Sequence, residues 1–403
     1  MDLKIFTDNI EEKALQQINT LMAQPAFKDC KVRIMPDVHA GAGCVIGFTA
    51  DLGDKVIPNI VGVDIGCGML TVELGKIDID FEKLDDVINE KVPNGMDVHE
   101  SDDAVMKLRS MFDLYTLHCY DQLKNKEWLE HSLGTLGGGN HFIEIDTDDE
   151  GNKYLVIHTG SRNIGKQAAD IWQKMAISRM CGKEKFHQIQ ADTIARLKAE
   201  GKEKKISIVL KLLKQMYDPE MSVPKELCYL TGEQREFYLH DMKWCQHFAH
   251  WNRYMIAETI CEHMGNKWNR RLNDWFETVH NYIGDDNIVR KGAISAKKGE
   301  RVLIPMNMRD GCIIGIGKGN EDWNCSAPHG AGRIMSRAEA KRSVTLDEFA
   351  ASMKGIYTTS IGLDTIDESP MVYKPMDEIM KNIDPTVEVE RIIKPVYNFK
   401  ASE

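Results

Sequence analysis

The chain has 403 residues, of which 42% are hydrophobic and 28% charged, so it can bury a large core and form two or three domains by length alone. Its formal net charge of −11 argues against a protein that coats nucleic acid, although a local basic groove is compatible with that total. No apolar run approaches the roughly 20 residues that a membrane span requires.

The cysteines and the N-terminal sequence both predict a cytoplasmic protein. The ten cysteines are scattered and form no CxxC pair, which is typical of reduced thiols in a reducing compartment. Residues Met1 to Asp8 lack the charged-then-apolar pattern of a secretory signal peptide. We therefore expect the protein to remain in the cytoplasm.

The N-terminal part of the chain alternates strand-like and helical segments with glycine-rich turns. In chain order we expect a helix at about Ile10–Met22, a strand at Lys31–Met35 ended by Pro36, a glycine-rich loop in PDVHAGAGCVIG, strand-like residues at Val61–Val72, helices at about Phe81–Glu90 and Asp103–Tyr120, and a strand at Leu155–His158. Loops at strand ends are where α/β architectures usually build sites. We therefore expect the functional site to lie at the glycine-rich turns.

From about residue 164 to residue 265, apolar residues recur at i, i+3 and i+4, which predicts helices. The segment 183–214 is rich in lysine and is interrupted by Gly201. A solvated helical hairpin on the surface is the favoured interpretation of this segment. A basic arm that contacts phosphates is the alternative.

A further helix is predicted over about 237–263, and it carries His240, His247 and His250. His247 and His250 lie one turn apart, a spacing that a metal pair would need. However, neighbouring aromatic and methionine residues mark the buried face of this helix. We therefore expect these histidines to point outward or to act indirectly.

The C-terminal third returns to strands, at Asn287–Ser295, Glu300–Ile304 and Cys312–Ile316. A helix is predicted over Ser336–Arg342, with Arg337 and Lys341 available to neighbouring anions. The last segment, 366–403, contains four prolines and is expected to wrap over the body in an extended conformation. One integrated domain with a helical insertion is the simplest account of the whole pattern.

Five short segments place a metal-binding or nucleophilic side chain beside glycines. They are VGVDIGCGM with Asp64 and Cys67, GTLGGGNHFIE with Asn140, His141 and Glu144, VIHTGSRNIG with His158 and Arg162, VHNYI with His280, and APHGAGRIMSR with His329. Glycine has no Cβ, so it lets the backbone approach a ligand closely. Each segment alone is compatible with an ordinary turn histidine or a cysteine packed as a small hydrophobe. Their co-occurrence in one chain predicts a metalloenzyme.

The donor types indicate which metals fit. One carboxylate, one thiolate and three imidazoles suit Mn²⁺, Zn²⁺, Fe²⁺ or Co²⁺ better than Mg²⁺, which prefers oxygen ligands. Five ligands could fill two adjacent metal positions that share the Cys67 sulfur. Two metals about 3.5–4 Å apart suit in-line phosphoryl displacement. Positive charge for phosphates is expected from Arg162, Arg290, Lys291 and Arg333. This combination indicates phosphate chemistry, either hydrolysis or ligation.

His329 is the histidine that distinguishes these two reactions. A neutral imidazole can attack phosphorus and hold a phosphoramidate intermediate. The small residues that follow it, Gly330, Ala331 and Gly332, leave room for a nucleotide against the backbone. By residue chemistry alone, a sixth metal ligand or a turn residue remains the alternative.

These motifs, in this order, resemble the RtcB family of RNA ligases. The matching segments are PDVHxGxG, VGVDIGCGM, LGTLGGGNHFIE, HTGSRNIG, HNYI, RKGA and SxxHGAGRxMSR, and they extend from Met35 to Lys400. The resemblance implies an α+β fold, in which residues 1–403 form one large domain with a mixed β-sheet core, peripheral helices and a helical insertion at about 165–265. It also implies GTP, two Mn²⁺ ions and an RNA substrate.

The implied reaction joins RNA ends bearing a 2′,3′-cyclic phosphate or 3′-phosphate to 5′-hydroxyl ends, in RNA repair or tRNA splicing. It proceeds through a histidine–GMP intermediate and transfer of GMP to the RNA 3′-phosphate. The 5′-hydroxyl then attacks and GMP leaves.

The resemblance also implies roles for individual residues. The expected manganese ligands are Asp64, Cys67, His141, His158 and His280, with Cys67 bridging the two ions. His329 is expected to carry GMP, and Arg162 to stabilise phosphate or the RNA end. Nucleotide contacts are expected from Asn140, Phe142, Glu144, Asn281, Pro305, Met306, Asn307, Met308, Cys312, Gly330, Ala331, Gly332 and Lys400, with Glu144 accepting hydrogen bonds from guanine.

One segment departs from the family pattern. Where the family usually has IPGSMG followed by a serine, this chain has Ile304-Pro305-Met306-Asn307-Met308-Arg309 and then Cys312. The lost glycines and serines leave the guanine preference open, whereas Asn307 can still form hydrogen bonds and Arg309 can supply charge. We expect a divergent branch and favour a repair ligase over a tRNA-splicing enzyme.

Two other functions compete with ligation. A metal-dependent phosphohydrolase or cyclic phosphodiesterase would process RNA ends without a nucleotide, with His329 as proton donor. A non-catalytic protein that binds RNA ends is disfavoured because the full ligand set and the HGAGR histidine are both present. The partner in each case is RNA and not a membrane.

Overall fold

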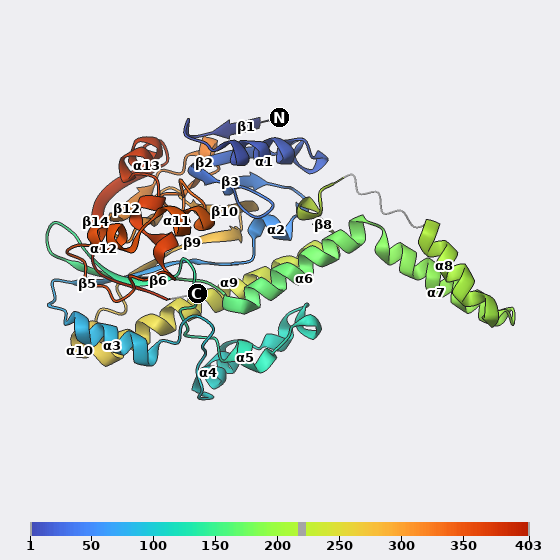
Figure 1. The fold of residues 1–403 in the computed structure, drawn as a ribbon, viewed down its shortest axis with the longest axis horizontal. Helices are drawn as coiled ribbons and strands as arrows, with labels where there is room; N and C mark the ends of the chain where they lie inside the picture. Colours follow the sequence, from blue (N-terminus) through green and yellow to red (C-terminus); the bar gives the residue numbers. More distant parts are fainter. Residues whose placement is uncertain (1, 217–222, 402–403) are drawn as a thin grey trace.

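The computed structural model describes residues 2–216 and 223–401, and a large β-sheet forms its centre (Figure 1). Its strands are β1 (Asp2–Ile5), β2 (Lys31–His39), β3 (Ile46–Asp51), β5 (Gly68–Gly75), β6 (Phe142–Thr147), β7 (Lys153–Thr159), β9 (Trp275–Ile283), β10 (Ile288–Ser295), β11 (Arg301–Asn307), β12 (Gly311–Gly317), β13 (Ser326–Pro328) and β14 (Val387–Lys400). Two short strands, β4 (Lys55–Val56) and β8 (Leu230–Thr231), pair with each other apart from this sheet.

The strand order is β1-β2-β3-β10-β9-β5-β7-β6-β14-β12-β11, and β13 pairs with β10 outside this path. β1 and β2 are parallel, and the other described pairs are antiparallel. The sheet is therefore mixed, as expected. Because neighbours in the sheet come from distant parts of the chain, the order brings the separate sequence motifs side by side.

Helices surround the sheet as expected (Figure 1). They are α1 (Glu12–Met22), α2 (Pro58–Val61), α3 (Phe81–Lys91), α4 (Asp103–Met111), α5 (Lys126–Glu130), α6 (Arg162–Met180), α7 (Lys183–Ala199), α8 (Ile206–Met216), α9 (Glu233–Met264), α10 (Asn266–Asn269), α11 (Arg337–Ser343), α12 (Leu346–Ser352) and α13 (Met376–Ile383). None of the described helices is both long and apolar enough to cross a membrane.

Helix α9 connects two parts of the hydrophobic core. It packs against β5 and β7 of the sheet and against α3 and α6. Phe248 belongs to the core cluster that includes Trp172 of α6, whereas Ile256 and Ile260 belong to the cluster under β5, β6 and β7. The helix is thus buried on several sides, and it holds the sheet against α3 and α6.

The predicted helical stretch between 164 and 265 is confirmed for α6, α7, α8 and α9, while residues 217–222 lie outside the described part of the chain. Figure 1 shows α7 and α8 as a helical hairpin that projects away from the sheet. The predicted hairpin at 183–214 is confirmed. Whether it contacts RNA stays a prediction.

Several predicted boundaries need correction. The strand predicted to end at Pro36 continues to His39, because the pairing of β2 with β3 is irregular between Ile34 and His39 and the missing N–H of proline costs no regular ladder bond there. The strand-like stretch at 61–72 begins with the end of helix α2, and its strand starts only at Gly68.

Two helical predictions also change. The helix predicted over 103–120 ends at Met111, and short 3₁₀ turns follow it. The C-terminal segment predicted to be extended contains helix α13 before the long strand β14, while residues 402–403 are outside the described chain. The remaining predicted strands and helices are confirmed within a few residues.

Candidate functional site

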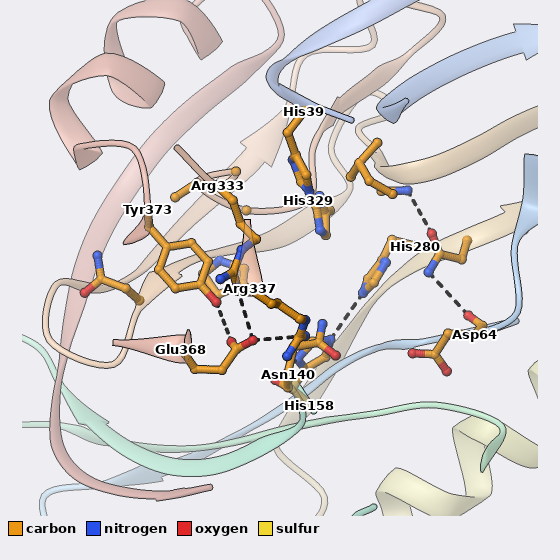
Figure 2. A pocket seen from close by; sticks show the side chains of 18 of the residues that line it. His39, Asp64, Asn140, His158, His280, His329, Arg333, Arg337, Glu368 and Tyr373 are labelled. Carbon is orange, nitrogen blue, oxygen red and sulfur yellow. Dashed lines mark hydrogen bonds and ion pairs between the residues drawn. The ribbon is translucent and has the colours of Figure 1, made fainter. Parts of the chain in front are cut away.

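A cavity of about 760 Å³ opens beside the central strands of the sheet (Figure 2). Its lining contains most of the residues that the motifs singled out, although they are far apart in the sequence. The lining residues from those motifs are Asp64, Asn140, Phe142, Glu144, His158, His280, Asn281, Pro305, Met306, Asn307, Met308, His329, Gly330, Ala331, Gly332 and Lys400.

Two groups of metal-type side chains meet at the base of this cavity and share Cys67. In the first, Cys67 Sγ lies 3.2 Å from His158 Nε2, which lies 3.3 Å from His280 Nε2. In the second, Cys67 Sγ lies 3.6 Å from His141 Nε2, which lies 3.3 Å from Asp64 Oδ2. The five predicted ligands therefore converge in the arrangement expected for two cations that share one sulfur.

Strand pairing places these ligands. His158 on β7 is directly opposite Met69 on β5, just beyond the turn that carries Cys67. On the other side of β5, the His280 backbone N–H donates to the Cys67 carbonyl at 2.8 Å. A Cβ on Gly160 would lie 2.3 Å from Asp64 Oδ1, so only glycine at this position lets the carboxylate approach.

The hydrogen bonds of the rings fix which nitrogen faces the centre. His141 Nδ1 donates to the Leu136 carbonyl at 2.9 Å, and His158 Nδ1 donates to the Asn140 carbonyl at 3.2 Å. Because a carbonyl only accepts, the proton stays on Nδ1 and the Nε2 lone pair faces the shared sulfur. Both rings are thus presented as neutral ligands.

The electrostatics of the centre fit a divalent cation. Burial lowers the pKa of His158 well below its usual value and that of His280 to about 3, so both imidazoles are neutral. Burial alone would raise the pKa of Asp64, but its interactions with His141, Cys67 and His280 together outweigh burial, and the pKa is lowered. Burial, followed by the charge of Asp64, raises the pKa of the Cys67 thiol. A bound cation would favour its thiolate.

A second layer of side chains holds the Asp64–Cys67 turn from behind. Arg253 of α9 donates to the Gly66 carbonyl at 2.9 Å and to the Thr159 carbonyl at 2.7 Å. Its Nε donates to Glu277 at 2.7 Å, and His250 lies 3.1 Å from the same carboxylate. His250 is therefore an indirect support of the centre, as the sequence predicted.

His329 follows β13 and stands beside the metal-type cluster. Its ring centroid lies 4.8 Å from that of His280. Its Nδ1 donates to Asp37 Oδ2 at 2.6 Å, and its backbone N–H donates to the same oxygen at 3.1 Å. Asp37 is completely buried, so this carboxylate orients the imidazole and leaves Nε2 for the cavity. Sequence reasoning missed Asp37, although it stands in the PDVH motif.

The other end of the cavity is formed by β6, β14 and β11. Glu144 on β6 is buried, and its Oε2 accepts a hydrogen bond from Asn398 at 2.8 Å. Burial raises the pKa of Glu144 to about 7 despite that bond. The Lys400 ammonium lies 5.7 Å from the centre of the Phe142 ring. Cys312 lies behind Glu144, and its Sγ is 3.6 Å from Glu144 Oε1.

A group of cationic side chains lines the cavity beside Glu368, and Figure 2 shows Arg333 and Arg337 next to this carboxylate. Its members surround the buried carboxylate of Glu368, which lies 3.1 Å from the Lys400 ammonium, 3.2 Å from Arg333 and 3.0 Å from Arg337. The Tyr373 hydroxyl donates to the same carboxylate. Three cations around one anion leave a net positive wall that suits phosphates.

Three predicted cations are elsewhere. Arg162, expected to stabilise phosphate, does not line this cavity and donates to Thr135 Oγ1 at 3.0 Å and to the Gly95 carbonyl. Arg290 is fully buried and pairs with Asp286, so it supports the strand instead of a ligand. Arg309 is paired with the neighbouring Asp310 outside the cavity lining.

Comparison with known proteins identifies the family of this chain. The sequence model described as tRNA-splicing ligase RtcB matches residues 17–401. The chain belongs to the RtcB family. Among its relatives, the RNA-splicing ligase RtcB of Escherichia coli strain K12 is 29% identical, with 96% of this chain and 94% of the relative covered. The tRNA-splicing ligase RtcB of Aeropyrum pernix is 27% identical, with 93% and 89% covered.

The extent of the match agrees with the geometry. The RtcB model spans the turns that carry the five metal-type ligands, His329 and Lys400. The strand order described above assembles the cavity around these residues.

Proposed function

We propose that this protein joins RNA ends bearing a 3′-phosphate or 2′,3′-cyclic phosphate to 5′-hydroxyl ends, using GTP and manganese. As a member of the RtcB family the protein is an RNA ligase, and the proposal adds the end chemistry, the nucleotide and the metal. The observation that carries it is His329, held by Asp37 and 4.8 Å from His280 between ring centroids.

In the first step, His329 Nε2 attacks the α-phosphorus of GTP. The N–P bond forms as the bond to the β-phosphate oxygen breaks, and pyrophosphate leaves. Asp37 holds the Nδ1 proton and stabilises the positive charge that the imidazole gains. Arg333, Arg337 and Lys400 offer positive charge to the triphosphate.

Asp64, Cys67, His141, His158 and His280 would hold manganese, which would polarise phosphate oxygens and neutralise their charge. At the nucleotide end, Phe142 and Glu144 offer a ring face and a carboxylate acceptor to the base. In the following steps GMP passes from His329 to the RNA 3′-phosphate, and the 5′-hydroxyl displaces it.

Labelling with radioactive GTP tests the proposal. Incubation with [α-³²P]GTP and Mn²⁺ is expected to label the protein through an acid-labile, base-stable bond. His329→Ala should abolish the label, while the matched change His263→Ala on the exposed end of α9 should leave it intact. If no nucleotide labels the wild-type protein with any divalent metal, the proposed ligation route is wrong.

The same assay addresses the altered Met306–Met308 segment, which lines the cavity. A panel of ATP, CTP, GTP and UTP is expected to show the strongest labelling with GTP. The competing phosphohydrolase or phosphodiesterase predicts metal-dependent loss of RNA 3′-phosphate, or opening of the cyclic phosphate, without any nucleotide.

A further inference from the structure

His39 is a further imidazole of the cavity, and the steps above give it no role. It ends strand β2, and it lines the cavity close to His329 (Figure 2). In the sheet, β2 is separated from β6 by β3, β10, β9, β5 and β7. His39 is therefore at one end of the cavity and Glu144 at the other, with His329 between them.

Asp37 orients both imidazoles. Its carboxylate accepts from His329 Nδ1 at 2.6 Å, and its backbone carbonyl accepts from His39 Nδ1 at 3.0 Å. No described residue forms a hydrogen bond with Nε2 of either ring. The two rings therefore share one anchor, and each has a free Nε2 available to a ligand in the cavity.

The bond to the Asp37 carbonyl defines the protonation of His39. A carbonyl only accepts, so Nδ1 carries the proton and Nε2 carries the lone pair. Burial, with a contribution from the neighbouring His329, lowers the pKa of His39, so the ring is neutral at pH 7. A neutral imidazole with a free Nε2 is equipped to accept a proton.

The in-line course of the last step shows where a proton acceptor is needed. The attacking oxygen and the leaving group are on opposite sides of the phosphorus atom. If GMP leaves toward the end that holds Phe142 and Glu144, the incoming 5′-hydroxyl approaches from the end that holds His39. We propose that His39 is the general base that deprotonates the 5′-hydroxyl in the sealing step, an inference that rests on the proposed ligation.

The step balances in atoms and charge. The hydroxyl proton moves to His39 Nε2 as the oxygen forms a bond to the RNA 3′-phosphorus. The phosphoanhydride bond to GMP breaks, and GMP leaves with the electron pair. The His39 imidazolium then releases its proton to solvent. No oxidant or reductant takes part.

Other titratable groups also lie near this end. Glu11 also lines it, but its Oε1 accepts from the Ala40 backbone N–H at 2.5 Å. Lys13 and Lys291 are cations, and the Lys291 ammonium donates to the Ala42 and Asn59 carbonyls. Asp64 belongs to the metal-type cluster. Among the described residues of this end, His39 is the free neutral base.

The variants His39→Asn and His39→Gln test this role. Asparagine retains a donor close to the position of Nδ1 and can keep the Asp37 bond, whereas glutamine places its amide near the position of Nε2. Neither can act as a base. In single-turnover reactions with GTP, Mn²⁺ and RNA carrying a 3′-phosphate and a 5′-hydroxyl, both variants should form the protein–GMP adduct at the wild-type rate.

Sealing should then slow by about 10²-fold or more, the usual contribution of a general base, and RNA activated with GMP at its 3′ end should accumulate. Normal adduct formation serves as the control for folding. Sealing within about threefold of wild type in both variants would overturn the role of His39, as would an equal loss of adduct formation and sealing. Failure of the wild-type protein to form an adduct would instead reject the proposed function.

Discussion

At the scale of single residues, Asp146 and Asp148 show how burial without partners and burial with partners affect ionisation. Both Asp146 oxygens are buried and have no hydrogen-bond partner among the described residues. Burial, and then the charge of Glu144, raise the pKa of Asp146 well above its usual value. Asp148 accepts from Asn152 and Tyr154, and these bonds outweigh burial and lower its pKa to about 2.

The changes Asp146→Asn and Asp148→Asn should therefore have opposite effects on stability. The pKa of Asp146 is higher in the folded state than in the unfolded chain, where it is about 3.8. Asp146 therefore lowers the free energy of unfolding increasingly as the pH rises above about 3.8. Its replacement should increase the free energy of unfolding by about 1–3 kcal/mol at pH 7.5, because the new amide can donate to Glu144.

The lowered pKa of Asp148 contributes stability above about pH 3.8, and this contribution is lost as the pH falls through about 2. Asp148→Asn should cost about 2 kcal/mol at pH 7.5 and less at pH 3. Urea unfolding of both variants at the two pH values measures these differences. Equal effects of the two substitutions at pH 7.5 would contradict the assigned environments.

At the scale of elements, the α7–α8 hairpin differs in charge from the rest of the protein. Residues 183–216 contain nine Lys and Arg but four Asp and Glu, a net charge of +5 in a chain whose total is −11. The hairpin projects from the body, as Figure 1 shows. The prediction to be tested is that exposed lysines on this projection contact phosphates beyond the RNA ends.

The triple variant Lys204→Gln, Lys205→Gln and Lys211→Gln tests this contact, since all three side chains are exposed. We expect a several-fold weaker RNA affinity at low salt, and a slope of log K against log [salt] reduced by about 2. Formation of the GMP adduct should be unchanged. Fluorescence anisotropy with labelled RNA over a salt series gives both quantities.

A matched control replaces three exposed lysines of the body, Lys83, Lys354 and Lys381, by glutamine. It removes the same charge from elsewhere and should leave the salt slope close to wild type. If the two triple variants bind RNA equally, the hairpin is a solvated surface element and makes no contact with the substrate.

At the scale of the whole molecule, the metal-type centre joins parts of the chain that are far apart in the sequence. Its ligands come from the turn before β5, the loop before β6, and strands β7 and β9. A cation that binds these groups only when they are assembled stabilises the folded state by mass action. Metal binding and global stability should therefore be coupled.

Removal of metal by a chelator should lower the Tm of the wild-type protein by several degrees, and Mn²⁺ should restore it, because 100 Kd of ligand contributes about 2.7 kcal/mol. Cys67→Ala should remove this response, since both groups of ligands share its sulfur. Cys261→Ala changes a buried thiol that belongs to neither group of ligands and should keep the response. Thermal unfolding with and without Mn²⁺ measures each case, and a metal response in Cys67→Ala would contradict the shared site.

Local sequence determined much of this protein. The i, i+3, i+4 patterns predicted α6 to α9, and the alternating segments predicted β10, β11 and β12, because these periods reflect contacts between near neighbours in the chain. The glycine-flanked motifs named all five metal-type ligands and His329, since donor chemistry belongs to the side chain itself.

Tertiary structure decided which of these groups meet. Asp37 and His329 are 292 residues apart in the sequence, and they pair because β13 joins β10 within the same sheet as β2. The same packing pairs Arg162 with Thr135 and Gly95 and Arg290 with Asp286, and neither arginine is part of the cavity lining. Such contacts depend on strand order and side-chain packing, which are collective properties of the folded chain that no local window of sequence contains.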